Sequence, residues 1–337
     1  MRLFLLTFFL FLIKGFALAQ DHAYSNFLQS PIYLNPALAG TSLGCDRFVL
    51  NYRNQYPAIK DAFAYYGVSY DRYVAEMNGG VAGMIQRTVE GEGFYTKNAF
   101  SLAYSFQGIK SENFSISLAL QGGLTNRSIN YDKLIFYDQL DKELGFVPGL
   151  PTAADNPVNS KKFYPDFGSG VAIVYRNSVL GASVSHLSEP DESLISTESI
   201  LPRKYQVHGS INIGIENRRN FGEPAIIPAF SYVKQGNFSN ATSNATAGVQ
   251  YRAYFFNIGA WYRSADILQG GNAAIVTCMF DNYLTDDVKP RFTIGLSYDY
   301  TLAKIAQRNT GGAFEVSLVY QSRKCSLNRN KVICPDF

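Results

Sequence analysis

Apolar and polar residues alternate along most of the chain with a period of two. About fourteen such segments, of about 8 to 13 residues, are separated by clusters of Gly, Asn, Asp, Pro and Ser, and helical periodicity is nearly absent. On the last two segments the apolar faces carry Phe292, Ile294, Leu296, Phe314, Val316 and Leu318, and the opposite faces carry Arg291, Ser297, Asp299 and Glu315. The pattern predicts an all-β fold whose strands have one apolar and one polar face.

The length and the ends of these strands distinguish two all-β architectures. Strands of soluble sandwiches average about five or six residues, whereas a strand that crosses a bilayer at a tilt needs about 9 to 11. The apolar faces here reach that length and tend to end in Tyr or Phe, as interfacial girdles do. Because every backbone group in lipid must be paired, membrane strands have to close into a barrel. We therefore predict a transmembrane antiparallel β-barrel of about 14 strands, with a soluble sandwich or barrel as the alternative.

Composition agrees with the membrane interpretation. Aromatic residues make up 15% of the 337 residues and charged residues only 17%, which suits strands that meet lipid and its two interfaces. Beyond the first 20 residues no apolar run approaches 18 residues, so no helix is expected to cross a bilayer. The net charge of +3, without a block of like charges, argues against nucleic acid as a partner.

The chain begins as exported proteins do. Arg2 precedes the apolar run Leu3–Ile13, and Ala17–Ala19 offers a small-x-small cleavage site. We predict cleavage between Ala19 and Gln20 and localisation in the bacterial outer membrane. The chain then divides into a signal peptide (1–19), an N-terminal segment (20–44), the barrel (45–324) and a C-terminal tail (325–337).

Loop lengths predict the orientation of the barrel. The connections after odd-numbered strands are long, as from Arg127 to Tyr164 and from Glu189 to Pro202, and tight turns such as Asn177–Ser178 often follow even-numbered strands. Outer-membrane barrels have short periplasmic turns and longer outer loops. We therefore expect both chain ends on the periplasmic side.

The stretch SPIYLNPALAG, Ser30–Gly40, cannot be a strand because it contains two prolines. Asn35 can cap a helical turn that Pro36 begins and Gly40 ends. Since a chain end beside the first strand has the lumen as its nearest shelter, we expect this segment at the periplasmic mouth of the barrel. A tail packed on the rim is the alternative.

Candidate catalytic and metal-binding groups are few. The histidines are His22, His186 and His208, and the adjacent strand residues Ser185 and His186 point to opposite faces, so they cannot form a nucleophile and base pair. We predict no enzymatic activity, no cofactor and no metal site.

The inner faces of the strands carry charges of both signs. Opposite charges in a lumen usually pair because an unpaired desolvated charge is costly, which favours a salt-bridged, partly occluded interior over a selective channel. The predicted lumen-facing charges are Arg47, Arg53, Asp71, Arg252, Arg263, Arg291, Asp299 and Glu315.

Four cysteines are too few for a disulfide scaffold. In a closed barrel the first strand pairs with the last, which places Cys45, Cys325 and Cys334 near one periplasmic corner, where a pair within about 7 Å between Cα atoms can form a bridge. Three unpaired thiols remain the alternative, and Cys278, on an apolar face, is expected to be free.

Short motifs follow one another over the whole chain after the leader. They are YLNPALAG (33–40), NYRNQYP (51–57), Gly79–Gly80, YDKLIFYDQLD (131–141), PDFGSGV (165–171), HLSEP (186–190), LPRKYQVHGS (201–210), GAWYR (259–263), IGLSYDY (294–300) and the terminal CPDF. In this order they resemble the PorP/SprF family of outer-membrane proteins of the type IX secretion system, although Tyr56 stands where family members often have Trp. The residues that carry the resemblance include Tyr33, Leu34, Asn35, Pro36, Gly40, Tyr52, Arg53, Pro165, Asp166, His186, Leu187, Pro202 and Arg203.

The resemblance implies a function that the residue pattern alone does not. It implies an outer-membrane component of type IX protein secretion, associated in some members with gliding motility. The implied partners are outer-membrane lipid, periplasmic components of the secretion system, and an exported surface adhesin or similar cargo. A passive porin or small-solute transporter is the alternative.

Overall fold

The computed structural model describes residues 21–322, apart from 43, 61, 92–93, 112, 142, 144, 148, 153–159, 195–197, 216–223, 237–241, 254, 266–271, 283–289 and 303–309. The predicted signal peptide with its cleavage site at Ala19 and Gln20, and the predicted tail with Cys325 and Cys334, lie outside these residues.

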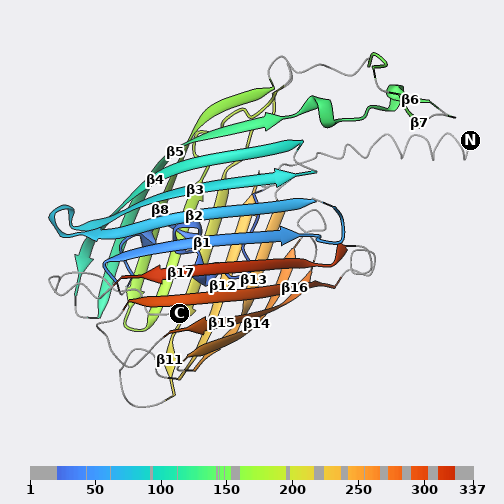
Figure 1. The fold of residues 1–337 in the computed structure, drawn as a ribbon. Coiled ribbons are helices and arrows are strands. Elements are labelled where there is room, and N and C mark those ends of the chain that lie inside the picture. Colours follow the sequence, from blue (N-terminus) through green and yellow to red (C-terminus); the bar gives the residue numbers. More distant parts are fainter. Residues whose placement is uncertain are drawn as a thin grey trace, which may run out of the picture.

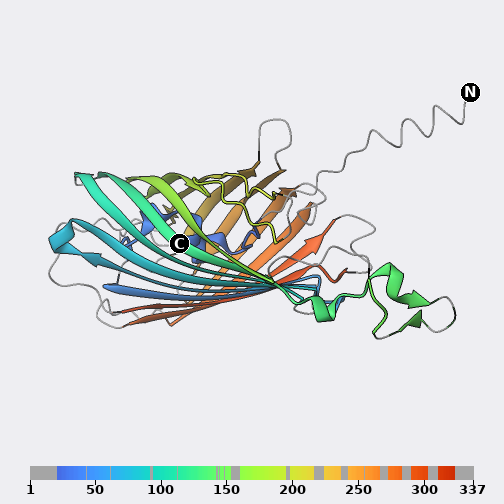
Figure 2. The same ribbon diagram turned by 90° about the horizontal axis from the view of Figure 1, so that it is seen from above.

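Fourteen antiparallel strands close into one barrel, which confirms the predicted fold (Figures 1 and 2). Closure comes from the pairing of the first strand with the last and of β10 with β12. A short β11 (Ile213–Gly214) adds to β12. The barrel strands are β1 (Asp46–Gln55), β2 (Phe63–Val74), β3 (Gly79–Glu90), β4 (Tyr95–Lys110), β5 (Phe114–Ile129), β8 (Lys161–Tyr175), β9 (Ser178–Ser185), β10 (Lys204–Ile211), β12 (Ala225–Gln235), β13 (Thr242–Arg252), β14 (Phe256–Ala265), β15 (Ala273–Asp281), β16 (Arg291–Thr301) and β17 (Ala313–Gln321).

The alternation of the sequence becomes an apolar outside and a polar inside. On β5, Leu118 is 55% exposed on the outer face, while its neighbour Ser117 is 1% exposed on the inner face. On β16, Leu296 is 39% exposed and Ser297 is 4% exposed. In a protein without a membrane this arrangement would leave a continuous apolar belt in water, so the outer face is the surface that meets lipid.

Several strands are longer than predicted. β4 and β5 each have 16 residues, against the segments of about 8 to 13 residues expected from the alternation. The boundaries predicted at Arg127 and Tyr164 are therefore wrong, since both residues lie within strands and the connection covers residues 130–160. The next long connection covers 186–203 rather than 189–202.

The connections differ between the two ends of the barrel. At the end where β1 begins, strands are joined by residues 75–78, 111–113 and 176–177, and we call this the short-turn end. The opposite, long-loop end carries residues 130–160 and 186–203. The distinction is not uniform, because 91–94 at the long-loop end is short and 282–290 at the short-turn end is longer.

Helical pieces are short. η3 (Ala75–Met77) closes the β2–β3 turn, and residues 130–160 include η4 (Tyr131–Lys133), η5 (Tyr137–Gln139) and a small hairpin of β6 (Leu140–Asp141) and β7 (Gly145–Phe146). In both ribbon views this hairpin projects away from the barrel wall (Figures 1 and 2). No helix in the described ranges is long and apolar enough to span a membrane.

Candidate functional site in the barrel lumen

The N-terminal segment lies inside the ring of strands (Figure 2). Residues 21–42, which we call the plug, contain η1 (Phe27–Gln29), α2 (Pro31–Leu34) and η2 (Pro36–Leu38). The capped turn predicted from NPALAG is η2, because the Asn35 side chain accepts a hydrogen bond from the Ala37 amide at 2.9 Å. Gly40 ends the turn with a φ of +71°. The two earlier helical pieces were not predicted.

Glycines in the wall let the plug backbone come close. A side chain at Gly80 would place its Cβ 2.1 Å from the Ala39 carbonyl oxygen, and one at Gly170 would lie 2.1 Å from Asn35 Oδ1. The Asn35 Nδ2 group donates to the Val171 carbonyl at 2.9 Å and to the Ala182 carbonyl at 3.3 Å. The NPALAG and PDFGSGV motifs, far apart in the sequence, therefore meet at one contact between plug and wall.

An ion pair fixes the plug where it enters β1. Arg47 Nε lies 2.7 Å from Asp71 Oδ1, and the guanidinium also donates to the Leu38 carbonyl at 3.1 Å. Asp71 Oδ2 accepts from the Gly40 amide at 2.8 Å. Since Asp71 is fully buried, its charge is compensated here by the neighbouring strand and the plug together.

A second, larger ion cluster holds the first half of the plug. Arg53 Nη2 and Arg263 Nη1 lie 2.9 Å and 2.7 Å from Asp299 Oδ2, and Arg53 Nη1 lies 3.4 Å from Glu315 Oε2. The Ser25 hydroxyl donates to Asp299 at 2.7 Å and accepts from both guanidinium groups.

The plug backbone completes this cluster. The amides of Ser25 and Asn26 donate to the two carboxylate oxygens of Glu315 at 2.8 Å and 3.1 Å. The four charged side chains are each at most 5% exposed. Because these charged groups are shielded from water, in surroundings of low dielectric constant, the plug contributes the hydrogen bonds that water would otherwise supply.

The outermost described residue of the plug is held by cations. The Asp21 carboxylate lies 3.2 Å from Lys97 Nζ, 3.0 Å from Lys204 Nζ and 2.8 Å from His186 Nε2. His186 Nδ1 also lies 2.7 Å from Asp166 Oδ2, so the ring bridges two carboxylates.

Two pKa shifts follow from this arrangement. Burial alone would raise the pKa of Asp21, but Lys97, Lys204 and His186 lower that pKa well below its usual value. Burial would lower the pKa of His186, but the two adjacent carboxylates, Asp21 and Asp166, raise it above its usual value. The imidazolium form therefore donates to both carboxylates.

The other two histidines, His22 in the plug and His208 in the wall, lie at contacts between plug and wall. His22 stacks on Tyr65, with ring centroids 4.2 Å apart, and on Tyr33 at 5.1 Å. Burial lowers the pKa of His22 to about 3, so the ring is neutral. His208 Nε2 lies 3.2 Å from Asn35 Nδ2. Within the described ranges no group of three or more His, Cys, Asp or Glu side chains is arranged to hold a metal ion.

The eight predicted lumen-facing charges all lie buried inside the barrel. Those not described above are Arg291, which lies 3.0 Å from Asp281, and Arg252 on β13. The sequence analysis did not single out Asp21, Ser25 or Lys97. The first two precede the strand pattern, so no periodicity marked them, and Lys97 gave no signal beyond its inward position.

The motif residues divide into two groups. Some contact the plug or belong to it, whereas the others lie elsewhere. Tyr52 faces outward beside Tyr66, with ring centroids 5.1 Å apart. At the long-loop end, Arg203 forms an exposed ion pair with Glu189 at 3.1 Å. Pro165 and Leu187 are exposed, and the Pro202 carbonyl accepts a hydrogen bond from Gln235 at 3.4 Å.

The cysteines are only partly described. Cys45 takes part in a disulfide, and its partner lies outside the described residues. Cys278 is a free thiol on the outer face of β15.

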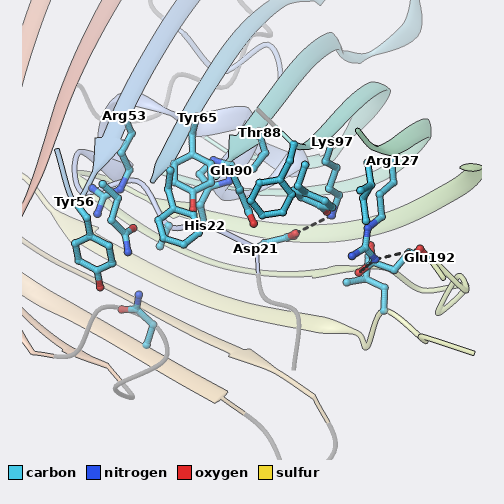
Figure 3. A pocket seen from close by; sticks show the side chains of 18 of the residues that line it. Asp21, His22, Arg53, Tyr56, Tyr65, Thr88, Glu90, Lys97, Arg127 and Glu192 are labelled. Atoms are coloured by element: carbon cyan, nitrogen blue, oxygen red, sulfur yellow. Dashed lines mark hydrogen bonds and ion pairs between the residues drawn. The ribbon is translucent and has the colours of Figure 1, made fainter. Parts of the chain in front are cut away.

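Above the plug, at the long-loop end, the lumen opens into a pocket of about 490 Å³. Asp21, His22 and Ala23 form one part of its lining, and the inner faces of β1 to β5 supply aromatic and charged side chains (Figure 3). Arg127 lies 3.0 Å from Glu192 and 4.9 Å from the centre of the Tyr95 ring. The rest of the lining includes Arg53, Tyr56, Phe63, Tyr65, Thr88, Glu90, Phe94, Lys97, Asn244 and Arg263.

Solved structures that match this chain include a channel, a transporter and an outer membrane protein. The CymD monoaromatic hydrocarbon channel matches with a TM-score of 0.50 and 10% identity, over 90% of this chain and 94% of that one. The Pseudomonas putida toluene transporter TodX matches with a TM-score of 0.45 and 8% identity, over 90% and 95%. Omp33 of Acinetobacter baumannii matches with a TM-score of 0.40 and 6% identity, over 83% and 99%. At 10% identity the likeness to CymD shows the fold alone, and no conclusion rests on the two weaker matches.

The sequence comparison is more specific. No curated protein matches the chain. The family model described as type IX secretion system membrane protein PorP/SprF matches residues 17–320, which is nearly the whole chain and includes the plug as well as the barrel. By this match the chain belongs to the PorP/SprF family of type IX secretion system membrane proteins.

Proposed function

We propose that this outer-membrane protein serves type IX secretion by binding and anchoring partners, and that it does not act as a pore. The observation that carries the proposal is the plug, which lies inside the lumen and is held by ion pairs and hydrogen bonds along its length, at Asp21, Ser25 and the Arg47–Asp71 pair. A porin needs a continuous aqueous path, whereas a barrel whose interior is occupied in this way presents its loops and rims to other molecules.

The two ends of the barrel would meet different partners. We assign the short-turn end to the periplasm, reached after cleavage of a signal peptide, where the rim would contact the secretion machinery. The long-loop end would face outward and contact an exported surface protein, an adhesin or similar cargo. Residues 130–160 suit such a contact because large apolar side chains are exposed there, with Tyr137 at 89% and Ile135 at 57%.

The test separates secretion from permeability. Deletion of the gene should abolish the surface display of an exported protein, and removal of residues 131–144 should reproduce that defect while the barrel remains in the membrane. Uptake of small solutes should be unchanged in both strains. Normal display together with lost solute uptake would contradict the proposal and support the porin alternative.

A further inference from the structure

The pocket above the plug contains one carboxylate that differs from its other charged groups. Glu90, the last residue of β3, lines the pocket and points inward (Figure 3). Among the residues that the structure describes, none forms a hydrogen bond or an ion pair with the side-chain carboxylate of Glu90. The other carboxylates of the lining, Asp21 and Glu192, each have a cation within 3.2 Å.

The cations of the lining are already paired. Arg53 and Arg263 share Asp299, Lys97 contacts Asp21, and Arg127 contacts Glu192. Lys97 and Arg127 are the cations that act on Glu90 electrostatically, but each is held by a carboxylate of its own. The half-buried Glu90 is therefore the acceptor that is left for a cation from outside the chain.

The neighbours of Glu90 are aromatic. In the strand register Glu90 lies directly beside Phe63 on β2 and beside Tyr95 on β4. Directly opposed residues on one face have Cβ atoms about 4.5–5.5 Å apart, so a group bound at the carboxylate lies beside both rings. One face of the Tyr95 ring already carries Arg127, which leaves its other face and the Phe63 ring for the bound group. Phe94 and Tyr65 add further aromatic lining to the same pocket. A carboxylate between aromatic rings is suited to ammonium and guanidinium groups, which the ring faces also attract.

We propose that this pocket binds a lysine or arginine side chain presented by a protein partner at the long-loop end. The inference rests on the proposed function for the identity of the partner as an exported protein. Its chemistry does not depend on that function, because it follows from the unpaired carboxylate, the flanking rings and the available volume of about 490 Å³, which lies within the usual range for ligand pockets.

Binding to purified protein in detergent tests the chemistry. The probes are a blocked Gly-Lys-Gly peptide and its Gly-norleucine-Gly analogue, which has a similar aliphatic stem but no charge, and calorimetry is the readout. The lysine peptide should bind more tightly than the norleucine peptide by about tenfold, and Glu90→Gln should abolish that difference. Phe63→Leu and Tyr95→Leu should each weaken the lysine peptide by about two- to tenfold.

A matched control removes a carboxylate elsewhere. Glu76→Gln alters an exposed residue of η3 at the short-turn end and should leave binding unchanged. Equal binding of the two peptides to the unmodified protein, or an unchanged preference in Glu90→Gln, would overturn the proposal. Each variant is first checked for the heat-dependent gel mobility of a folded barrel.

Secretion in cells separates this inference from the proposed function. Glu90→Gln should reduce surface display, and an exported partner with its basic residue replaced should show the same loss. Normal display in Glu90→Gln would overturn the assignment of the pocket to the exported partner. Removal of residues 131–144 would still test the proposed function independently.

Discussion

The two halves of the lumen are built differently. Toward the short-turn end, η2 lies against the wall, where the Ser105 hydroxyl donates to the Ala37 carbonyl at 3.0 Å and Gly80 meets the Ala39 carbonyl. Toward the long-loop end, a pocket of about 490 Å³ remains above the plug. One half is filled as a protein core is filled, and the other is a chamber with charged and aromatic walls. The plug is packed against the wall in one half, and the pocket that we propose as a binding site lies in the other.

The difference follows from side-chain size. The filled half presents small inward residues to the plug, such as Gly80, Ala82 and Gly170. The open half presents long ones, such as Arg53, Tyr65 and Arg127. The two arginines pair with carboxylates, and space remains between the side chains. Substitutions where small wall residues pack on the plug should therefore have different effects on stability and conductance from substitutions where charged side chains hold the plug.

The largest effect is expected where charge holds the plug. Arg53→Met leaves Asp299 with Arg263 but removes the cation from the buried Glu315. Loss of one partner of a buried pair costs about 3–5 kcal/mol. The plug should loosen, which would appear as a lower free energy of unfolding in urea and as channel openings in a planar bilayer.

The control for this change is an arginine in an exposed ion pair. Arg72 pairs with Asp46 at 3.7 Å, and its side chain is 56% exposed, so Arg72→Met should cost about 0–1 kcal/mol. Similar losses for the two variants would show that the buried cluster does not hold the plug.

A smaller effect is expected where packing holds the plug. Gly80→Val places side-chain atoms on the Ala39 carbonyl, and overpacking of this kind costs about 1–3 kcal/mol. Because the clash is with the plug, we expect raised bilayer conductance without loss of the barrel. Gly83→Val is the matched control, since a Cβ there meets only Leu102 at 3.6 Å. Conductance that stays at the level of the control would contradict the role of Gly80 in closure.

Inward-facing residues can be picked out from the sequence because strand periodicity is local. Arg47, Arg53 and Glu315 could be assigned to the lumen from alternation alone. Their partners could not, because pairing depends on register: Arg53 lies directly beside Glu315, and Arg47 beside Asp71. Register is fixed by closure of the whole barrel, which no single segment encodes.

The contacts of the plug were harder to predict. Asn35 and Gly40 could be recognised from cap and turn chemistry, but Ser25 is a short polar residue in a segment without periodicity. Asp21 meets His186 although 165 positions separate them. Such contacts depend on where the plug lies inside the closed barrel, and local pattern carries no signal for that position. The resemblance to a family supplied the function, which the residue pattern did not.

The smallest effect concerns the end of the plug at the border of the two halves. The raised pKa of His186 means that its contribution is complete below its ordinary value of 6.5 and is lost as the pH rises through the raised pKa. The lowered pKa of Asp21 means that its contribution is complete above its ordinary value of 3.8 and is lost as the pH falls through the lowered pKa. His22, with a pKa of about 3, stays neutral between these limits. The plug should therefore be held most firmly between about pH 4 and 6.5, and less firmly at alkaline pH, where Lys97 and Lys204 still contact Asp21.

Opening frequency in a planar bilayer should rise modestly from pH 6 to pH 9 in the unmodified protein. His186→Gln, which keeps a hydrogen-bonding side chain without the titration, should have the same opening frequency at both pH values. A pH dependence that persists unchanged in this variant would place the titrating group elsewhere and remove His186 from the closure of the barrel.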